Sequence, residues 1–231
     1  MRKLTRRASL GLGLAALAAG SMPGGSRAAE PAVLKAVRRT IEVNGKAASV
    51  FGIAGPGGRA GHAARLGEPF RVRLENRMDD ETLIHWHGLT PPVEQDGVPL
   101  LSQAPLPPGK AYDYDFVISR AGTHWMHSHV GLQEQQMLAA PLIIHETEQP
   151  LFEEQEHVVM VHDFTFRDPA EILAELQKGG GGHAMHGMDH SKMAGGMTMP
   201  SMLNDVAFDA YLANDRTLAD PEVVRVEAGA T

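Results

Sequence analysis

The sequence of 231 residues contains no cysteine. This absence excludes disulfide bonds, zinc–thiolate sites and cysteine nucleophiles, and it excludes every thiolate-ligated copper or iron site from these residues. Twelve His and twelve Met are present instead. In an oxidising compartment, where free thiols are a liability, His and Met are the natural borderline and soft metal ligands.

The apolar run near the N-terminus is too short to span a membrane as an ordinary helix. It covers Leu10 to Ala19, follows a basic start with Arg6 and Arg7, and precedes small residues at Ser26 and Ala28. Charge, apolar run and cleavage site in this order predict that residues 1–28 are a cleaved signal for the twin-arginine export machinery. A disordered basic tail is the alternative. We expect a periplasmic bacterial protein with no stable membrane insertion.

Basic residues do not outnumber acidic ones in this sequence. Cleavage after Ala28 removes five of the 21 basic residues and none of the 28 acidic ones, which leaves a formal net charge of −12. Such a surface repels phosphate backbones. Nucleic acid is therefore excluded as an expected partner, and cations are favoured.

Long helical periodicity is absent between Val33 and about Glu148. Short alternating segments such as "PFRVRLEN" and "AYDYDFVI" predict half-buried strands, and "VNGK" at Asn44-Gly45 predicts a hairpin. The long Pro- and Gly-rich stretch "PPVEQDGVPLLSQAPLPPGK" predicts a connection. The pattern indicates an all-β, antiparallel β-sandwich domain over residues 29–150.

A second unit is expected over residues 151–231. It begins with an apolar, strand-like segment, and "DPAEILAELQKG" predicts a short helix with Asp168 as its N-cap. A Met- and His-rich insert of residues 179–202 follows, and "ANDR" then echoes "VNGK" of the first unit. The echo ends where the next strand should begin, so we expect an incomplete second copy of the domain and an N-terminal piece of a longer protein.

Two His-X-His motifs carry the chemistry. His85 and His87 in "LIHWHG" share one face of a strand, and so do His127 and His129 in "GTHWMHSH". One such motif is more often a surface or structural pair. Two of them on neighbouring strands would bring four imidazoles together, which suits copper or zinc. His124 has the wrong parity for that face.

These two motifs, with "DGVPLLSQAPLPPGKAYDYDF" between them, resemble the first domain of the multicopper oxidases, the family of laccases and bacterial cuprous oxidases. The resemblance covers roughly residues 33 to 231. It implies a cupredoxin-like Greek-key fold. It also implies that one-electron oxidation of a small reducing substrate, phenol-like or copper(I), at a type 1 copper is coupled to four-electron reduction of dioxygen to water at a trinuclear copper cluster.

The resemblance also implies roles for individual residues. His85 would bind the type 2 copper, and His87, His127 and His129 the type 3 coppers. Asp96 stands where relatives often hold an acid that assists proton delivery to the cluster. Asp96-Gly97 also fits a plain turn, and the two interpretations are compatible.

The sequence departs from the family in what it lacks. The type 1 site needs a cysteine, and four further ligands of the trinuclear cluster come from a later domain. No histidine follows His190. The type 1 copper is therefore expected only in a missing C-terminal part, and residues 29–231 alone are expected to be inactive as an oxidase.

The insert of residues 179–202 suggests a further role, since thioether sulfur prefers copper(I). A copper(I)-collecting loop would use Met185, Met188, Met193, Met197, Met199 and Met202, assisted by His183, His186 and His190. Met-rich inserts accompany copper tolerance among bacterial members of the family. A biased, flexible linker is the alternative.

Three functions remain open from the sequence. The first is the N-terminal part of a periplasmic multicopper oxidase. The second is a periplasmic copper-binding or copper-sequestering protein without oxidase activity. The third and weakest is a β-domain with a structural zinc.

Overall fold

A computed structural model describes residues 30–147, 155–180 and 206–227. The described residues, apart from Glu30, belong to one compact unit, Pro31–Thr231. The expected export signal lies outside the described residues. So do all the expected copper(I) ligands of the insert and the expected boundary near residue 150.

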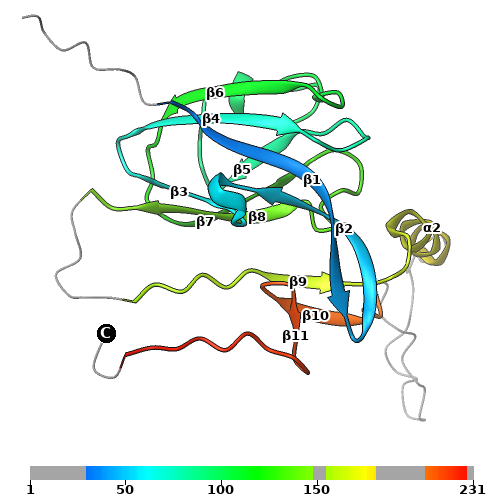
Figure 1. Cartoon of the computed structure of the whole chain (residues 1–231). Helices are drawn as coiled ribbons and strands as arrows, with labels where there is room; N and C mark the ends of the chain where they lie inside the picture. Colours follow the sequence, from blue (N-terminus) through cyan, green and yellow to red (C-terminus); the bar gives the residue numbers. More distant parts are fainter. Residues whose placement is uncertain (1–29, 148–154, 181–205, 228–231) are drawn as a thin grey trace, which may run out of the picture. The chain divides into compact units, whose positions relative to one another are not determined.

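The first sheet holds four strands in the order β2-β1-β4-β6 (Figure 1). They are β1 (Ala32–Val43), β2 (Lys46–Ala54), β4 (Pro69–Asn76) and β6 (Ala111–Val117). In β4 the side chains alternate between the core and the surface, as a strand with one buried face requires. Outward-facing Arg73 of β4 pairs with Asp113 of β6 at 2.8 Å.

The second sheet has the order β3-β8-β7-β5. Its strands are β3 (His62–Arg65), β5 (Ile84–His87), β7 (Gly122–Ser128) and β8 (Ala139–His145), and two short 3-10 turns, η1 (Pro56–Gly58) and η2 (Val93–Gln95), lie in the connections. The core between the two sheets includes fully buried Trp86, Tyr114 and Phe70. The Trp86 ring packs edge-on against both others, with centroids 4.8 Å apart.

The expected β-sandwich is confirmed, and its sheets prove to be mixed. Most neighbouring strands are antiparallel, but β1 pairs with β4 and β3 pairs with β8 in parallel. The reason is the order of the chain: it crosses between the sheets, so strands that are neighbours in a sheet are not always consecutive in the sequence. The predicted hairpin joins β1 to β2, with positive φ at Asn44 and Gly45 (51° and 77°).

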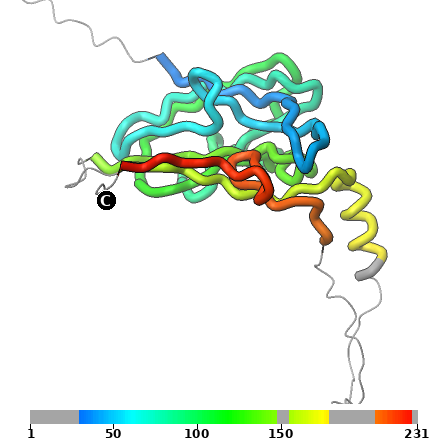
Figure 2. Tube along the Cα trace, turned by 60° about the horizontal axis from the view of Figure 1, so that its bottom comes forward, coloured from blue at the N-terminus to red at the C-terminus, as the bar shows by residue number. Residues whose placement is uncertain are grey.

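A third, smaller sheet has the order β11-β10-β9, and Figure 2 shows its strands running beside one another. It contains β9 (Val161–Phe164), β10 (Ala210–Ala213) and β11 (Arg216–Thr217), and the helix α2 (Pro169–Gly180) follows β9. The Asp168 side chain accepts a hydrogen bond from the Ala170 N–H at 2.8 Å, which confirms the predicted N-cap.

The turn between β10 and β11 repeats the first hairpin. Asn214 and Asp215 both have positive φ (49° and 67°), like Asn44 and Gly45, and this pair of conformations belongs to the tight hairpin turns. The sequence similarity between "VNGK" and "ANDR" is therefore matched by a similar backbone conformation. The strands on either side are much shorter than β1 and β2, and residues 221–227 form no strand.

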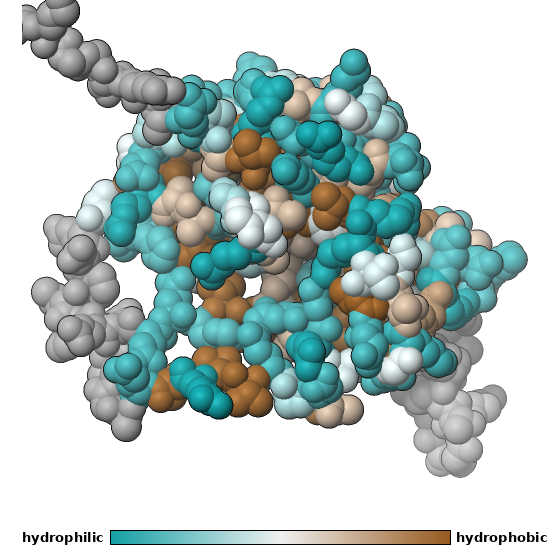
Figure 3. Space-filling view, in the orientation of Figure 1, coloured by the Kyte–Doolittle hydropathy of each residue, from teal (hydrophilic) through white to brown (hydrophobic). Residues whose placement is uncertain are grey.

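A second apolar cluster joins this small sheet to the sandwich. Phe164 and Leu212 pack with Val43, Val50 and Met137, and all five side chains are buried. Other apolar side chains of this part stay exposed, among them Val159, Val161, Tyr211, Val223 and Val226. Figure 3 shows hydrophobic patches on one face, among hydrophilic surface.

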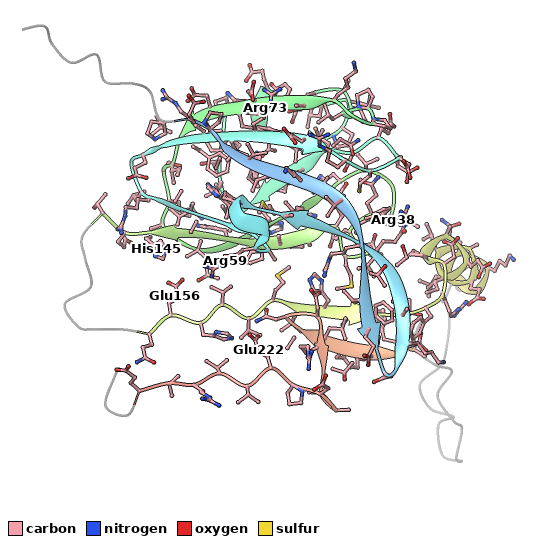
Figure 4. The ribbon with its side chains drawn as sticks, in the orientation of Figure 1. Arg38, Arg59, Arg73, His145, Glu156 and Glu222 are labelled. Atoms are coloured by element: carbon pink, nitrogen blue, oxygen red, sulfur yellow. The ribbon has the colours of Figure 1, made fainter. Side chains whose placement is uncertain are left out.

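His145 and Glu156 stand on either side of residues 148–154 in the sequence and contact each other. His145 Nδ1 is 3.7 Å from Glu156 Oε2, and the two side chains point toward each other in Figure 4. Among the described residues, no helix is long and apolar enough to cross a membrane.

Candidate metal centre

The two histidine motifs lie on directly paired strands. β5 and β7 are antiparallel, with His85 opposite His127, Trp86 opposite Met126 and His87 opposite Trp125. Because alternate residues of a strand share a face, Trp86 and Met126 enter the core while the histidines gather on the other face. His129 comes directly after β7 and continues the same alternation.

The four imidazole rings form one cluster. The His85 centroid lies 5.7 Å from that of His87, 5.6 Å from His127 and 4.6 Å from His129. One ring nitrogen each of His85, His87 and His127 fall within 4.8 Å of one another, and His129 adds its ring 4.9 Å from that of His127. The expected meeting of the two pairs is what the structure has.

The cluster is open on one side. His127 is buried and His85 half-buried, whereas His87 and His129 are exposed. The exposed members give a solute access to the ring nitrogens, and the buried ones are held by the protein around them.

Asp96 contacts His85 in two ways. The main-chain carbonyl of Asp96 lies 2.8 Å from His85 Nδ1, and its carboxylate Oδ1 lies 3.3 Å from the same nitrogen. Nδ1–H therefore donates to the carbonyl, and Nε2 of His85 is left for the cluster. Asp96 also ends the η2 turn, where its N–H donates to the Val93 carbonyl.

Gly97 allows this close approach. Its φ is +75°, and a Cβ at this position would lie 1.9 Å from the carbonyl oxygen of Ile84. No side chain fits there, so glycine lets the turn contact the strand that carries His85. Both interpretations of Asp96-Gly97, as a turn and as a neighbour of the cluster, agree with this geometry.

His127 is held by groups that sequence reasoning missed. Its Nδ1 lies 2.9 Å from Glu134 Oε2, and its ring stacks on Trp125 with centroids 4.0 Å apart and planes at 14°. The parity of "GTHWMHSH" could have placed Trp125 on the histidine face. Glu134 comes from the loop after β7, and no periodic pattern relates it to the cluster.

The electrostatics favour neutral imidazoles at His127 and His129. Burial lowers the pKa of His127 below its ordinary value, Glu134 opposes this shift, and the imidazole of His129 adds to it. Partial desolvation by its neighbours also lowers the pKa of the more exposed His129, with a further lowering by His85. A neutral ring has a nitrogen lone pair, which metal coordination requires.

Residues 36–149 match the family model described as Multicopper oxidase. This part of the chain belongs to the multicopper oxidase family. Copper resistance protein A of Pseudomonas syringae pv. tomato is 39% identical over 155 residues, which are 67% of this chain and 24% of the relative. The chain thus spans about a quarter of the length of this relative.

Solved multicopper oxidases have the same fold. The laccase of Botrytis aclada aligns with a TM-score of 0.54 at 31% identity, over 62% of this chain and 27% of the laccase. The blue copper oxidase of Nitrosomonas europaea aligns with a TM-score of 0.61 over 86% of this chain and 57% of that chain. Its identity is 22%, so this likeness concerns the fold alone.

Copper is the metal that multicopper oxidases use, and the donors of this domain fit it. The cluster presents imidazole nitrogens, which suit copper. In both His85 and His127, the other ring nitrogen, Nδ1, lies within hydrogen-bond distance of an oxygen acceptor, as in most metal-binding histidines. His124, expected to stand apart, lies on β7 beside Gly88 and is outside the group of three close nitrogens.

Proposed function

We propose that this chain supplies one half of the trinuclear copper cluster of a multicopper oxidase. The observation that carries the proposal is the convergence of ring nitrogens from both His-X-His motifs within 4.8 Å. His85 would hold the type 2 copper, and His87, His127 and His129 the type 3 coppers. When bound, copper supplies the one-electron chemistry that couples substrate oxidation to the reduction of dioxygen to water.

In that reaction, the residues of this chain would bind copper and orient the histidines that hold it. The Asp96 carbonyl holds Nδ1 of His85, and the Glu134 carboxylate holds Nδ1 of His127. Trp86, between His85 and His87, anchors β5 in the core. The Asp96 carboxylate, 3.3 Å from His85 Nδ1, is proposed to take part in proton delivery to dioxygen. The substrate is a small reductant, either phenol-like or copper(I).

Copper tolerance in the bacterial periplasm is the proposed setting. The twin-arginine pattern of residues 1–28 supports export, and the similarity to copper resistance protein A favours copper(I) as a substrate. The Met/His segment of residues 179–202 is proposed to collect copper(I). In a longer protein that oxidises both substrates, its deletion should weaken activity on copper(I) more than activity on phenols.

A copper-binding protein without oxidase activity is the second candidate, and the absence of cysteine from these residues favours it for the chain taken alone. The half-cluster proposal is tested by assaying oxygen uptake of copper-loaded residues 29–231 with a phenol and with copper(I). We expect copper binding and no turnover, since the chain has no type 1 ligand set. Turnover by these residues would contradict the half-cluster proposal. A preference for zinc over copper in competition would favour the structural-zinc alternative.

A further inference from the structure

His127 is the most constrained histidine of the cluster. Its side chain is 6% exposed, and its Nδ1 lies 2.9 Å from Glu134 Oε2. Its other nitrogen, Nε2, lies 3.2 Å from His87 Nδ1 and so faces the cluster. The Ser128 carbonyl is also 3.2 Å from Nδ1. Both oxygens near Nδ1 are acceptors, which requires the proton to be on that nitrogen.

The backbone that carries Glu134 is fixed by its neighbour. Gln133 is buried, and its Oε1 accepts hydrogen bonds from the hydroxyls of Thr82 and Ser128, both at 2.8 Å. Its Nε2 donates to the Glu81 carbonyl at 2.8 Å. These bonds connect the loop to the segment before β5 and to the end of β7. The backbone of Glu134 is therefore fixed relative to β5 and β7, the two strands that carry the histidines.

In the described part of the chain, no salt bridge competes for the Glu134 carboxylate, which contacts the neutral His127 ring. Its own carbonyl accepts a hydrogen bond from the Met137 N–H at 2.8 Å, which closes the turn after it. The carboxylate is 38% exposed. An anionic acceptor is thus held on the far side of the ring from the cluster.

The two anchored histidines differ in their acceptors. His85 Nδ1 has a neutral carbonyl at 2.8 Å, with the Asp96 carboxylate further away at 3.3 Å. His127 Nδ1 has the carboxylate as its nearest acceptor. A charged acceptor gives the stronger hydrogen bond, and it also offsets part of the positive charge that a metal brings to the ring.

We propose that Glu134 is a positioning residue for the metal centre. By accepting the Nδ1–H bond it fixes the His127 tautomer whose Nε2 lone pair faces His87 and the cluster. This inference rests on the proposed function, because it assigns Glu134 a purpose in metal binding. It adds a residue outside both His-X-His motifs to the groups that determine copper affinity.

The test uses the 231-residue chain and two readouts. The first is the His127 tautomer in the metal-free protein, observed through long-range ¹H–¹⁵N couplings of the imidazoles. The second is copper(II) affinity in competition with a chelator. Glu134→Ala should remove the preference for Nδ1–H and weaken copper binding about 10- to 100-fold, the range typical when a metal-binding histidine loses its hydrogen-bond partner. Glu134→Gln keeps the size and an acceptor oxygen, and should keep the tautomer with a smaller loss of affinity.

Glu94→Gln is the matched control. Glu94 is exposed, lies in the η2 turn near the cluster, and its side chain has no hydrogen bond or ion pair among the described residues. It should bind copper as the wild type does. An unchanged tautomer, or unchanged copper affinity, in a folded Glu134→Ala protein overturns the inference. If Glu134→Ala does not fold, Glu134→Gln decides through affinity alone, and wild-type affinity then overturns the inference. Failure of the wild type itself to bind copper overturns the proposed function instead.

Discussion

His85 and His127 stand directly opposite each other across the β5–β7 ladder, with ring centroids 5.6 Å apart. This relationship joins two motifs that are about forty residues apart in the sequence. It depends on register, because a slip by one residue would turn a whole strand's side chains to the opposite face. The cluster therefore depends on the register of β5 and β7, and groups that stabilise this strand pair also stabilise the site.

Gln133 is one such group. In Gln133→Leu, the hydroxyl protons of Thr82 and Ser128 lose their acceptor, and the Glu81 carbonyl loses its donor. Leaving a buried polar group unsatisfied costs about 1–3 kcal/mol, so we expect a loss of at least about 2 kcal/mol in urea unfolding. Gln135→Leu, at an exposed position of the same loop, should change stability by less than about 0.5 kcal/mol. Equal effects of the two substitutions would contradict this role.

Gly97 tests the turn that brings Asp96 to His85. In Gly97→Ala the new Cβ would lie 1.9 Å from the Ile84 carbonyl oxygen, so the backbone has to move. Gly109→Ala is the control, since Gly109 has nearly the same φ (+72°) and open space around it. The control should lose about 1–2 kcal/mol from backbone strain alone. Gly97→Ala should lose clearly more in thermal unfolding, and a smaller or equal loss would show that the turn is not packed as described.

Arg39 and Asp215 connect β1 to the β10–β11 turn through two hydrogen bonds, one of them 2.9 Å long. Asp215→Asn keeps a residue that tolerates the positive φ of this turn and removes the charge. Both side chains are about one third exposed, so we expect a loss on the order of 1 kcal/mol. Hydrogen exchange should speed up in residues 210–217 and stay unchanged in β5 and β7. Faster exchange throughout the sandwich would contradict a local role.

His62 provides a pH dependence. Burial lowers its pKa below the ordinary value of 6.5, and its ring packs edge-on against Phe70. The folded state then resists protonation, so its contribution is fully present above about pH 6.5 and stability falls as the pH drops through and below that value. His62→Gln removes the titrating imidazole. Urea unfolding at about pH 7.5 and pH 5 should show a smaller acid loss in the variant, and an identical loss in both proteins would refute the assignment.

The sequence predicted the parts of the site that repeat with period two. The alternation in "PFRVRLEN" placed β4, and the parity of the two His-X-His motifs placed four rings on one face and kept His124 off it. The hairpin at Asn44-Gly45 and the N-cap at Asp168 followed from local turn and cap preferences. Each of these depends on a few neighbouring residues.

Features that depend on distant residues could not be read in this way. The parallel pairs β1–β4 and β3–β8 result from how the chain crosses between sheets. Glu134 and Gln133 act through a loop whose path is set by tertiary contacts, and nothing in their spacing connects them to His127 or Thr82. Of the apolar, strand-like segment "EHVVMVHDFTF" that begins the second unit, only Val161–Phe164 forms a strand.

The claim that both histidine pairs form one copper site is tested most directly by electron paramagnetic resonance of the chain loaded with one equivalent of copper(II). The nitrogen hyperfine pattern should indicate at least the three imidazoles whose ring nitrogens converge. Changing His85 and His87 to Ala should abolish that pattern, and so should changing His127 and His129. Deleting the Met/His segment of residues 179–202 should leave it intact. If each pair can be removed without altering the pattern, and only the deletion abolishes it, copper binds elsewhere and the account is wrong.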